Sequence, residues 1–154
     1  MKAFVFRAET VLRLRRRADE QAQQALAFAE QRVRQAEGAL LAAEQSVRDQ
    51  CERSAQVDRE SQTLDLAIWY RNWIQKLRHD VEWKRRLLRE RRIEADDARV
   101  RAQDAHRKLR AIEKLKERLW SAHGVRERSE EQQALDELGS QQYVNRRLGG
   151  HLEY

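Results

Sequence analysis

Residues 64–88 read LDLAIWYRNWIQKLRHDVEWKRRLL, and they lie between two long, charged segments of a chain that contains no proline. Each flanking segment has small apolar residues at regular intervals, so the chain has to fold back near this stretch to bury both sets. Three of the four tryptophans fall within it, at Trp69, Trp73 and Trp83. A chain reversal next to exposed aromatic side chains predicts a binding surface at the turn.

The composition is typical of long helices. The chain has 154 residues, of which 38% are charged and 6% are aromatic. This is too polar for a compact core and too periodic for a disordered chain. Strong helix formers dominate, and a pair of long helices buries only a narrow seam. We therefore expect an all-α fold in one domain, residues 1–154: a long antiparallel two-helix coiled-coil hairpin with a C-terminal helical extension.

A seven-residue repeat predicts the first helix, over about residues 8–60, and the two seam positions of the heptad recur along it. One position contains Leu12, Leu26, Val33, Leu40, Val47 and Ile68, and the other contains Ala22, Ala29, Ala36, Ala43, Val57 and Leu64. Polar residues interrupt the seam at Arg15, Asp19, Gln50, Ser54 and Ser61. Gly38 should cost about 1 kcal/mol relative to alanine without ending the helix.

The connection between the helices is expected at about residues 60–66, with Asp65 as the N-cap of a second helix that begins at Leu66. This helix should extend to about residue 138, and residues 139–154 should fray. Its seam contains Ile74, Val81, Leu88, Ala95, Ala102 and Leu109 at one position and Tyr70, Leu77, Ala98, Ala105, Ile112 and Leu119 at the other. Lys84 and Arg91 interrupt the second position.

Folding the two repeats about Asp65 places large residues opposite small ones, as close packing requires. The expected facing pairs are Leu26 with Ala105, Val33 with Ala98, Ala29 with Ala102, Ala36 with Ala95, Ala43 with Leu88, Val57 with Ile74 and Leu12 with Trp120. This complementarity favours a hairpin within one chain over a parallel dimer, and it leaves an antiparallel dimer of hairpins open.

At the N-terminus, Phe4 and Phe6 precede the helix and predict a hydrophobic staple that fixes its entry. A run of arginines follows at Arg13, Arg15, Arg16 and Arg17. The net charge is +6 and the isoelectric point is near 9.9, which suggests acidic partners. Because 32 basic residues are mixed with 26 acidic ones, we interpret the surface as intermixed.

The sequence has no Gly-rich phosphate loop, no metal-binding spacing of His or Cys, and no catalytic triad pattern. We expect no enzyme activity, no cofactor and no metal. Cys51 is interpreted as a bystander on the first helix. No apolar run reaches the roughly 18 to 20 residues of a membrane span, and no signal peptide pattern opens the chain. A soluble, cytoplasmic protein is therefore expected, without direct membrane insertion.

Three stretches together resemble the flagellar export protein family FliJ. FVFRAETVLRLRRRADEQAQQALA is similar to the N-terminal segment of the family, IWYRNWIQKLRHDVEWKRRLL to the part of helix two near the turn, and AIEKLKERLWSAHGVRERSEEQQALDELG to its C-terminal stretch. The resemblance implies a central-stalk-like coiled coil of the flagellar type III export apparatus, at the cytoplasmic face of the inner membrane. It implies three partners, which are the ring of the export ATPase FliI, the export gate protein FlhA and export chaperones.

The resemblance also implies two sets of contact residues. Export-gate binding falls on Trp69, Trp73 and Leu77, while Asp80 and Lys84 depart from the pattern of the family. ATPase-ring binding falls on Leu12, Arg15, Arg16, Asp136 and Glu137. The coiled-coil seam is assigned to Leu26, Ala29, Val33, Ala36, Leu40, Leu88, Ala95, Ala98, Ala102 and Ala105.

Other interpretations stay open from the residues alone. Trp69 and Trp73 lie on one face of the helix, beside the seam, where they could instead cap the coiled coil by folding over the turn. A stalk protein of a virulence type III secretion system would share the architecture. A nucleic-acid-associated coiled coil is a further alternative, and it would use the cations Lys84, Arg85, Arg86, Arg89, Arg91 and Arg92. Phosphate binding needs such cations to face one way, but these surround the helix, so no nucleic acid partner is expected.

Overall fold

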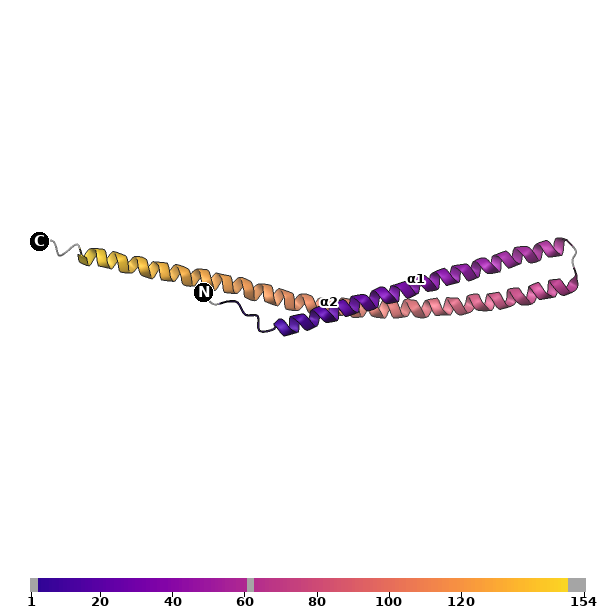
Figure 1. Ribbon diagram of the computed structural model, residues 1–154, viewed down its shortest axis with the longest axis horizontal. Helices are drawn as coiled ribbons and strands as arrows, with labels where there is room; N and C mark the ends of the chain where they lie inside the picture. Colours follow the sequence, from indigo (N-terminus) through magenta and orange to yellow (C-terminus); the bar gives the residue numbers. More distant parts are fainter. Residues whose placement is uncertain (1–2, 61–62, 150–154) are drawn as a thin grey trace. The chain divides into compact units, whose positions relative to one another are not determined.

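Two long helices make up almost all of the structure. The computed structural model describes residues 3–60 and 63–149. Helix α1 spans Glu9–Arg59 and helix α2 spans Leu64–Gly149, and these described ranges contain no strand. The helices are antiparallel (Figure 1). The prediction of an all-α, two-helix hairpin is thereby confirmed.

Contacts divide the chain into two compact units, which we describe separately. The hairpin unit comprises residues 17–106, and the terminal unit comprises residues 1–16 together with 107–154. The expectation of a single domain stays a prediction.

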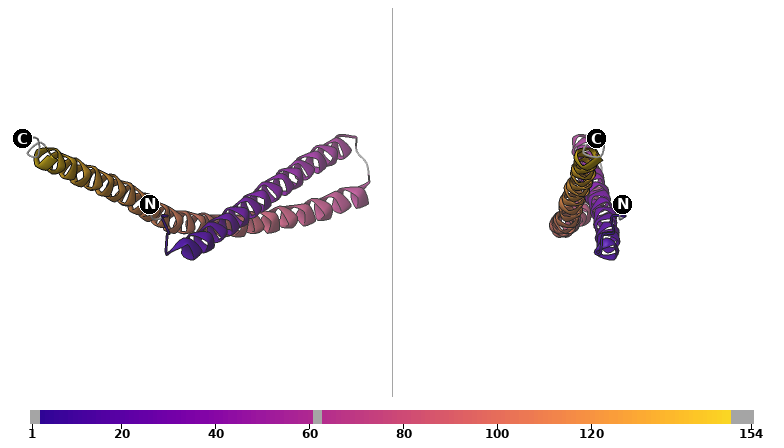
Figure 2. Two further views of the ribbon diagram at one scale, coloured as in Figure 1. Left: turned by 60° about the vertical axis from the view of Figure 1, so that its left-hand side comes forward. Right: turned by 90° about the vertical axis from the view of Figure 1, so that its left-hand side faces the viewer.

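In the hairpin unit, the helices pack along a seam of small and branched residues. The buried side chains of this unit are Ala29, Ala36, Ala43, Val81, Leu88, Ala95 and Ala102. The other assigned seam residues are half-buried, namely Leu26, Val33, Leu40, Ala98 and Ala105. The view in Figure 1 and the left view in Figure 2 both show the two helices running alongside each other in this unit. Every buried residue of the unit therefore falls at a heptad seam position.

Two residues assigned to the first seam lie elsewhere. Leu64 is 76% exposed and Ile68 is 43% exposed. Because α1 ends at Arg59, both residues belong to the first turns of α2 and lie outside the register of the first helix. Their assignment to that seam was wrong. The interruption assigned to Ser61 lies outside the described residues.

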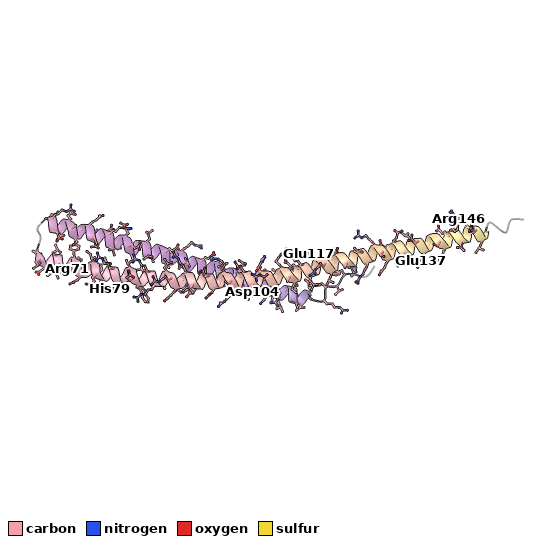
Figure 3. The ribbon with its side chains drawn as sticks, turned by 180° about the vertical axis from the view of Figure 1, so that it is seen from behind. Arg71, His79, Asp104, Glu117, Glu137 and Arg146 are labelled. Atoms are coloured by element: carbon pink, nitrogen blue, oxygen red, sulfur yellow. The ribbon has the colours of Figure 1, made fainter. Side chains whose placement is uncertain are left out.

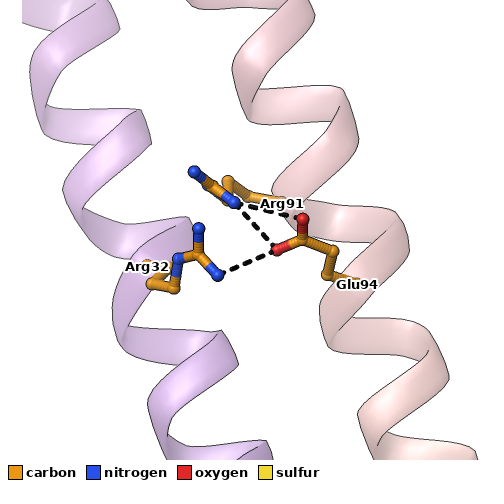
Figure 4. Close-up of polar contacts among 3 residues, drawn as sticks. All are labelled: Arg32, Arg91 and Glu94. Atoms are coloured by element: carbon orange, nitrogen blue, oxygen red, sulfur yellow. Dashed lines mark hydrogen bonds and ion pairs between the residues drawn. The ribbon is translucent and has the colours of Figure 1, made fainter.

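A ladder of ion pairs fixes the register of the hairpin unit. Among the pairs that join the helices, three are at heptad spacing: Glu30 to Arg99 at 3.6 Å, Glu37 to Arg92 at 3.1 Å and Glu44 to Arg85 at 3.2 Å. Each step moves seven residues forward in α1 and seven residues back in α2, as a heptad repeat requires. A fourth pair joins Arg32 to Glu94 at 3.3 Å, and Arg91 donates to the same carboxylate (Figure 4).

The start of α2 differs from the prediction. The backbone N–H groups of Leu66 and Ala67 donate to the carbonyl oxygen of Thr63 at 3.1 and 3.3 Å. Helix α2 therefore begins at Leu64, and the N-cap assignment of Asp65 was wrong. Asp65 instead lies in the first helical turn. A carboxylate is favourable there because it faces the positive end of the helix dipole.

The end of α2 lies well beyond the predicted position. The helix continues past residue 138 to Gly149, so the expected fraying of residues 139–149 was wrong, and residues 150–154 lie outside the described part. Gly139 costs about 1 kcal/mol in a helix, and no proline follows to end it. The side chains of residues 128–148 are all exposed. This part of α2 is held by its backbone hydrogen bonds and by local contacts such as Ser140 Oγ to the Asp136 carbonyl at 2.8 Å.

In the terminal unit, the N-terminal segment packs against α2. Phe6 and Leu109 are 8% and 7% exposed, and Leu12 is fully buried between them. Phe4, Ala8 and Ile112 pack around this cluster. The expected staple of Phe4 and Phe6 is therefore part of a larger contact that joins residues before α1 to the side of α2.

Substituting Gly38 by alanine is expected to stabilise the protein by about 1 kcal/mol, because alanine restricts the unfolded chain and favours the helix. A Cβ atom at this position would meet no other atom within 4 Å. Urea denaturation followed by circular dichroism measures the change. The reverse substitution at the exposed neighbour, Ala39→Gly, is the control and should destabilise by a similar amount. A destabilised Gly38→Ala variant would contradict this account.

Candidate functional site

An exposed aromatic pair lies on α2 near the turn. Trp69 and Trp73 are 54% and 40% exposed, and their rings stack with centroids 6.1 Å apart. Trp69 also contacts Tyr70 edge-on at 5.0 Å. Leu77 lies one turn further along α2 and is half-buried, because it also occupies a seam position. The two tryptophans form a preformed apolar surface, and we call Trp69, Trp73 and Leu77 the tryptophan surface.

Asp80 and Lys84, which follow the tryptophan surface on α2, interact with each other. Lys84 Nζ donates to the Asp80 carboxylate, one turn away on the same helix. Their charges are therefore paired beside the tryptophan surface. Trp83 is 63% exposed and makes no ring contact among the described residues.

A groove of about 610 Å³ lies between the helices near the turn. It is lined by Cys51, Ser54, Ala55, Asp58, Ala67, Arg71, Ile74, Gln75 and Arg78. Arg71 and His79 mark this end of α2 in Figure 3. The groove forms because polar or small residues occupy the seam of α1 here, so the layer is less filled than in the middle of the hairpin unit.

The terminal unit contains a second groove, of about 440 Å³. It is lined by Phe4, Leu12, Arg16, Arg110, Glu113, Lys116, Glu117 and Trp120. The Phe4 ring meets Trp120 edge-on at 5.1 Å and His123 at 5.6 Å. Leu12 and Trp120, which the heptads placed opposite each other, thus line one groove. Trp120 is 63% exposed, so an approaching side chain could stack on it.

The Leu12 side chain is fully buried in this structure. It has no exposed area, because Phe6 and Leu109 enclose it. It therefore supports the groove from beneath, and its assignment to the ATPase ring stays a prediction. Of the other residues assigned to the ATPase ring, Arg16, Asp136 and Glu137 are exposed and Arg15 is half-buried.

A charged contact fastens the start of α1 to α2. Lys116 Nζ donates to Glu9 at 2.9 Å and lies 5.7 Å from the centre of the Phe6 ring. The hydrogen bond from Lys116 holds the pKa of Glu9 below its ordinary value, and the charges of Arg16 and Arg13 act in the same direction. A lowered carboxylate pKa means that this contact contributes above the unfolded pKa and is lost as the pH falls through the folded value.

The C-terminal part of α2 presents acidic residues to solvent. Asp136 accepts a hydrogen bond from Gln132 Nε2 at 3.1 Å and is otherwise open to solvent. Glu117 and Glu137 mark the beginning and the middle of this part, and Arg146 lies near its end (Figure 3). All three side chains are exposed.

The cations proposed for nucleic acid are mostly engaged. Arg85 bonds both Glu44 and Glu82, and this pairing raises the pKa of its guanidinium, with the Glu44 hydrogen bond as the largest cause. Lys84, Arg91 and Arg92 also face carboxylates. Four of the six candidate cations are therefore neutralised locally, which weakens the case for phosphate binding on this face.

Two other kinds of site are absent from the described ranges. No helix within residues 3–60 and 63–149 is both long and apolar enough for a membrane span. The same residues include no cluster of three or more His, Cys, Asp or Glu side chains that could hold a metal ion.

Comparison with known families identifies the family of the chain. A family model described as flagellar FliJ protein matches residues 4–148, which is nearly the whole chain. No curated protein and no solved structure matches the chain. The family match covers both helices, the tryptophan surface and the groove of the terminal unit. The protein is therefore a member of the FliJ family, a coiled-coil protein of flagellar export.

Proposed function

We propose that this protein is a cytoplasmic, stalk-like component of the flagellar type III export apparatus. It would couple the ring of the export ATPase FliI to the export gate protein FlhA and would assist export chaperones, without catalysis of its own. It would act at the cytoplasmic face of the inner membrane. The family match supports this role over that of a virulence stalk protein.

The observation that best supports a gate contact is the exposed tryptophan pair. Two stacked indoles that are about half exposed lose little side-chain entropy on binding, and the exclusion of water from their exposed surface contributes binding free energy. They lie outside the seam, so the hairpin does not need them for its packing. Trp69 and Trp73 are therefore proposed as the centre of the gate contact, with Leu77 at its edge.

The seam of the hairpin unit supports a coupling role. Buried alanines on both helices bring the backbones close together, and the ion-pair ladder fixes the register. Sliding one helix past the other would break three pairs and misplace the alanine layers. A hairpin that resists this shear can transmit a conformational change between two partners.

The terminal unit is proposed as the contact for the ATPase ring. Arg16 lines the groove, Arg15 precedes Arg16 on α1, and Asp136 and Glu137 lie further along α2. Leu12 contributes indirectly by holding the groove in shape. Purifying the protein with the export ATPase and measuring ring assembly tests this part of the proposal.

The gate contact is tested with Trp73→Ala. Binding to the cytoplasmic domain of the export gate protein is measured by calorimetry, and thermal unfolding is measured in parallel. We expect affinity to fall by about 2 kcal/mol, as for a hot-spot residue, with little change in thermal stability. Trp83→Ala removes an exposed indole further along the same helix and is the control. Lost stability with unchanged gate affinity would show that the tryptophans only cap the coiled coil.

A further inference from the structure

The charge of this protein is unevenly distributed between its parts. The hairpin unit, residues 17–106, has seventeen basic and seventeen acidic side chains. In the terminal unit, residues 3–16 and 107–126 have eleven lysines and arginines against three glutamates. We call this pair of segments the cationic surface. These segments therefore have a net charge of +8, whereas the basic and acidic side chains of the hairpin unit balance.

The next segment along α2, after the cationic surface, has a net negative charge. Residues 127–138 contain five carboxylates and one arginine. Leu135 and Leu138 are 63% and 56% exposed, and they flank Asp136 and Glu137. We call residues 127–138 the acidic segment. It combines apolar side chains with adjacent carboxylates on an exposed helix.

The cationic surface has a shape that such a segment fits. Its groove of about 440 Å³ has Phe4, Leu12 and Trp120 among its lining residues, and Arg16 stands at its rim. A leucine could pack on the exposed Trp120 ring while a neighbouring carboxylate pairs with Arg16. Glu113 and Glu117 also line the groove and oppose any anion there, so the apolar contact with Trp120, which a leucine makes and a phosphate backbone does not, favours the acidic segment.

The acidic segment cannot reach the groove of its own molecule. Trp120 and Leu135 belong to one continuous helix. At 1.5 Å per residue they are about 22 Å apart along its axis. The complementary charges are therefore available only to another molecule.

We propose that two copies of this chain associate through their terminal units, with the acidic segment of each copy on the cationic surface of the other. Residues 107–126 of the cationic surface and the acidic segment are consecutive on α2, so antiparallel pairing of two α2 helices makes both contacts at once. Such an interface is self-complementary and closes as a dimer with twofold symmetry. This inference does not depend on the proposed function.

Sedimentation of the purified full-length chain tests the proposal. A dimer is expected at about 50 mM NaCl, with the association weakened at least tenfold at about 500 mM, where the Debye length falls to a few ångström. A monomer at low salt and at about 100 μM protein, a high concentration for a specific interface, would overturn the proposal. A dimer that persists unchanged at high salt would overturn it too.

Charge-reversal variants locate the interface. Arg13→Glu with Arg16→Glu reverses charge on the cationic surface, and we call it the cationic variant after that surface. Asp136→Arg with Glu137→Arg reverses charge on the acidic segment, and we call it the acidic variant. Each variant should be monomeric when it is alone. Mixing the two variants should restore association. One contact then joins the two altered surfaces, whose charges are reversed but complementary, and the other contact joins the two unaltered surfaces. The matched control reverses two exposed carboxylates of the hairpin unit, Glu52→Arg with Glu90→Arg, and should remain a dimer.

Other occupants of the cationic surface would give different results. If the cationic variant loses binding to a DNA duplex while the unmodified chain sediments as a monomer, the surface serves nucleic acid and the proposal is wrong. If the cationic variant loses binding only to the export ATPase, and the unmodified chain is again monomeric, the cationic surface binds a separate acidic protein and the dimer proposal is wrong. Failure of the mixed variants to associate would likewise contradict the dimer.

Discussion

Replacing Leu12 by alanine is expected to destabilise the terminal unit by about 2 to 5 kcal/mol, the range for a fully buried leucine. Leu12 has no exposed area and lies between Phe6 and Leu109. The truncation leaves a cavity, and the cluster is too small for neighbouring side chains to fill it. Residues 3–16 should therefore detach from α2, while the hairpin unit stays folded. Amide hydrogen exchange, resolved by segment, measures this selective loss.

Leu14→Ala provides the matched control for this prediction. Leu14 lies on the same helix but is 59% exposed, so the same truncation should change stability by less than about 0.5 kcal/mol. Faster exchange throughout residues 17–106 in Leu12→Ala would contradict the division into two units. Equal effects of Leu12→Ala and Leu14→Ala would contradict the buried cluster.

Replacing Ala36 by leucine is expected to destabilise the hairpin unit by about 1 to 3 kcal/mol, the usual cost of inserting methylenes into a packed layer. Ala36 is 7% exposed and lies among the buried alanines of the seam. The larger side chain should force the helices apart and weaken the adjacent Glu37–Arg92 pair. Chemical denaturation measures the loss, and a motility assay measures coupling.

Ala39→Leu is the control, since Ala39 is exposed on the same helix and should accept leucine with little effect. We expect Ala36→Leu to impair motility while the protein is still folded. Normal motility in a variant with separated helices would argue strongly against coupling through the hairpin.

The seam was predictable because periodicity is a local property of the sequence. Ala29, Ala36, Ala95 and Ala102 recur at heptad spacing, and their burial needs only that two helices meet. The turn was less predictable. No glycine or proline marks it, and the start of α2 depends on the carbonyl of Thr63 rather than on the side chain of Asp65.

The extent of the C-terminal helix was missed for a related reason. Gly139 indicated an end, but a single glycine without a following proline costs too little to stop α2. The interpretation of the surface as intermixed holds for the hairpin unit and not for the terminal unit. That difference appears only when residues 3–16 are known to lie beside residues 107–126, because neither segment is unusual when it is read alone.

The ion-pair ladder has a consequence for which helices can pair. In the three pairs at heptad spacing, the acidic members Glu30, Glu37 and Glu44 come from α1 and the basic members come from α2, while the Arg32–Glu94 pair has the opposite arrangement. If the first helices of two molecules met in antiparallel fashion, glutamate would face glutamate at each step, and two second helices would bring arginine against arginine. Like charges placed opposite each other are unfavourable. Within residues 17–106 the ladder therefore disfavours pairing between like helices and favours pairing of α1 with α2, whereas the dimer proposed above pairs two α2 helices through residues outside the ladder.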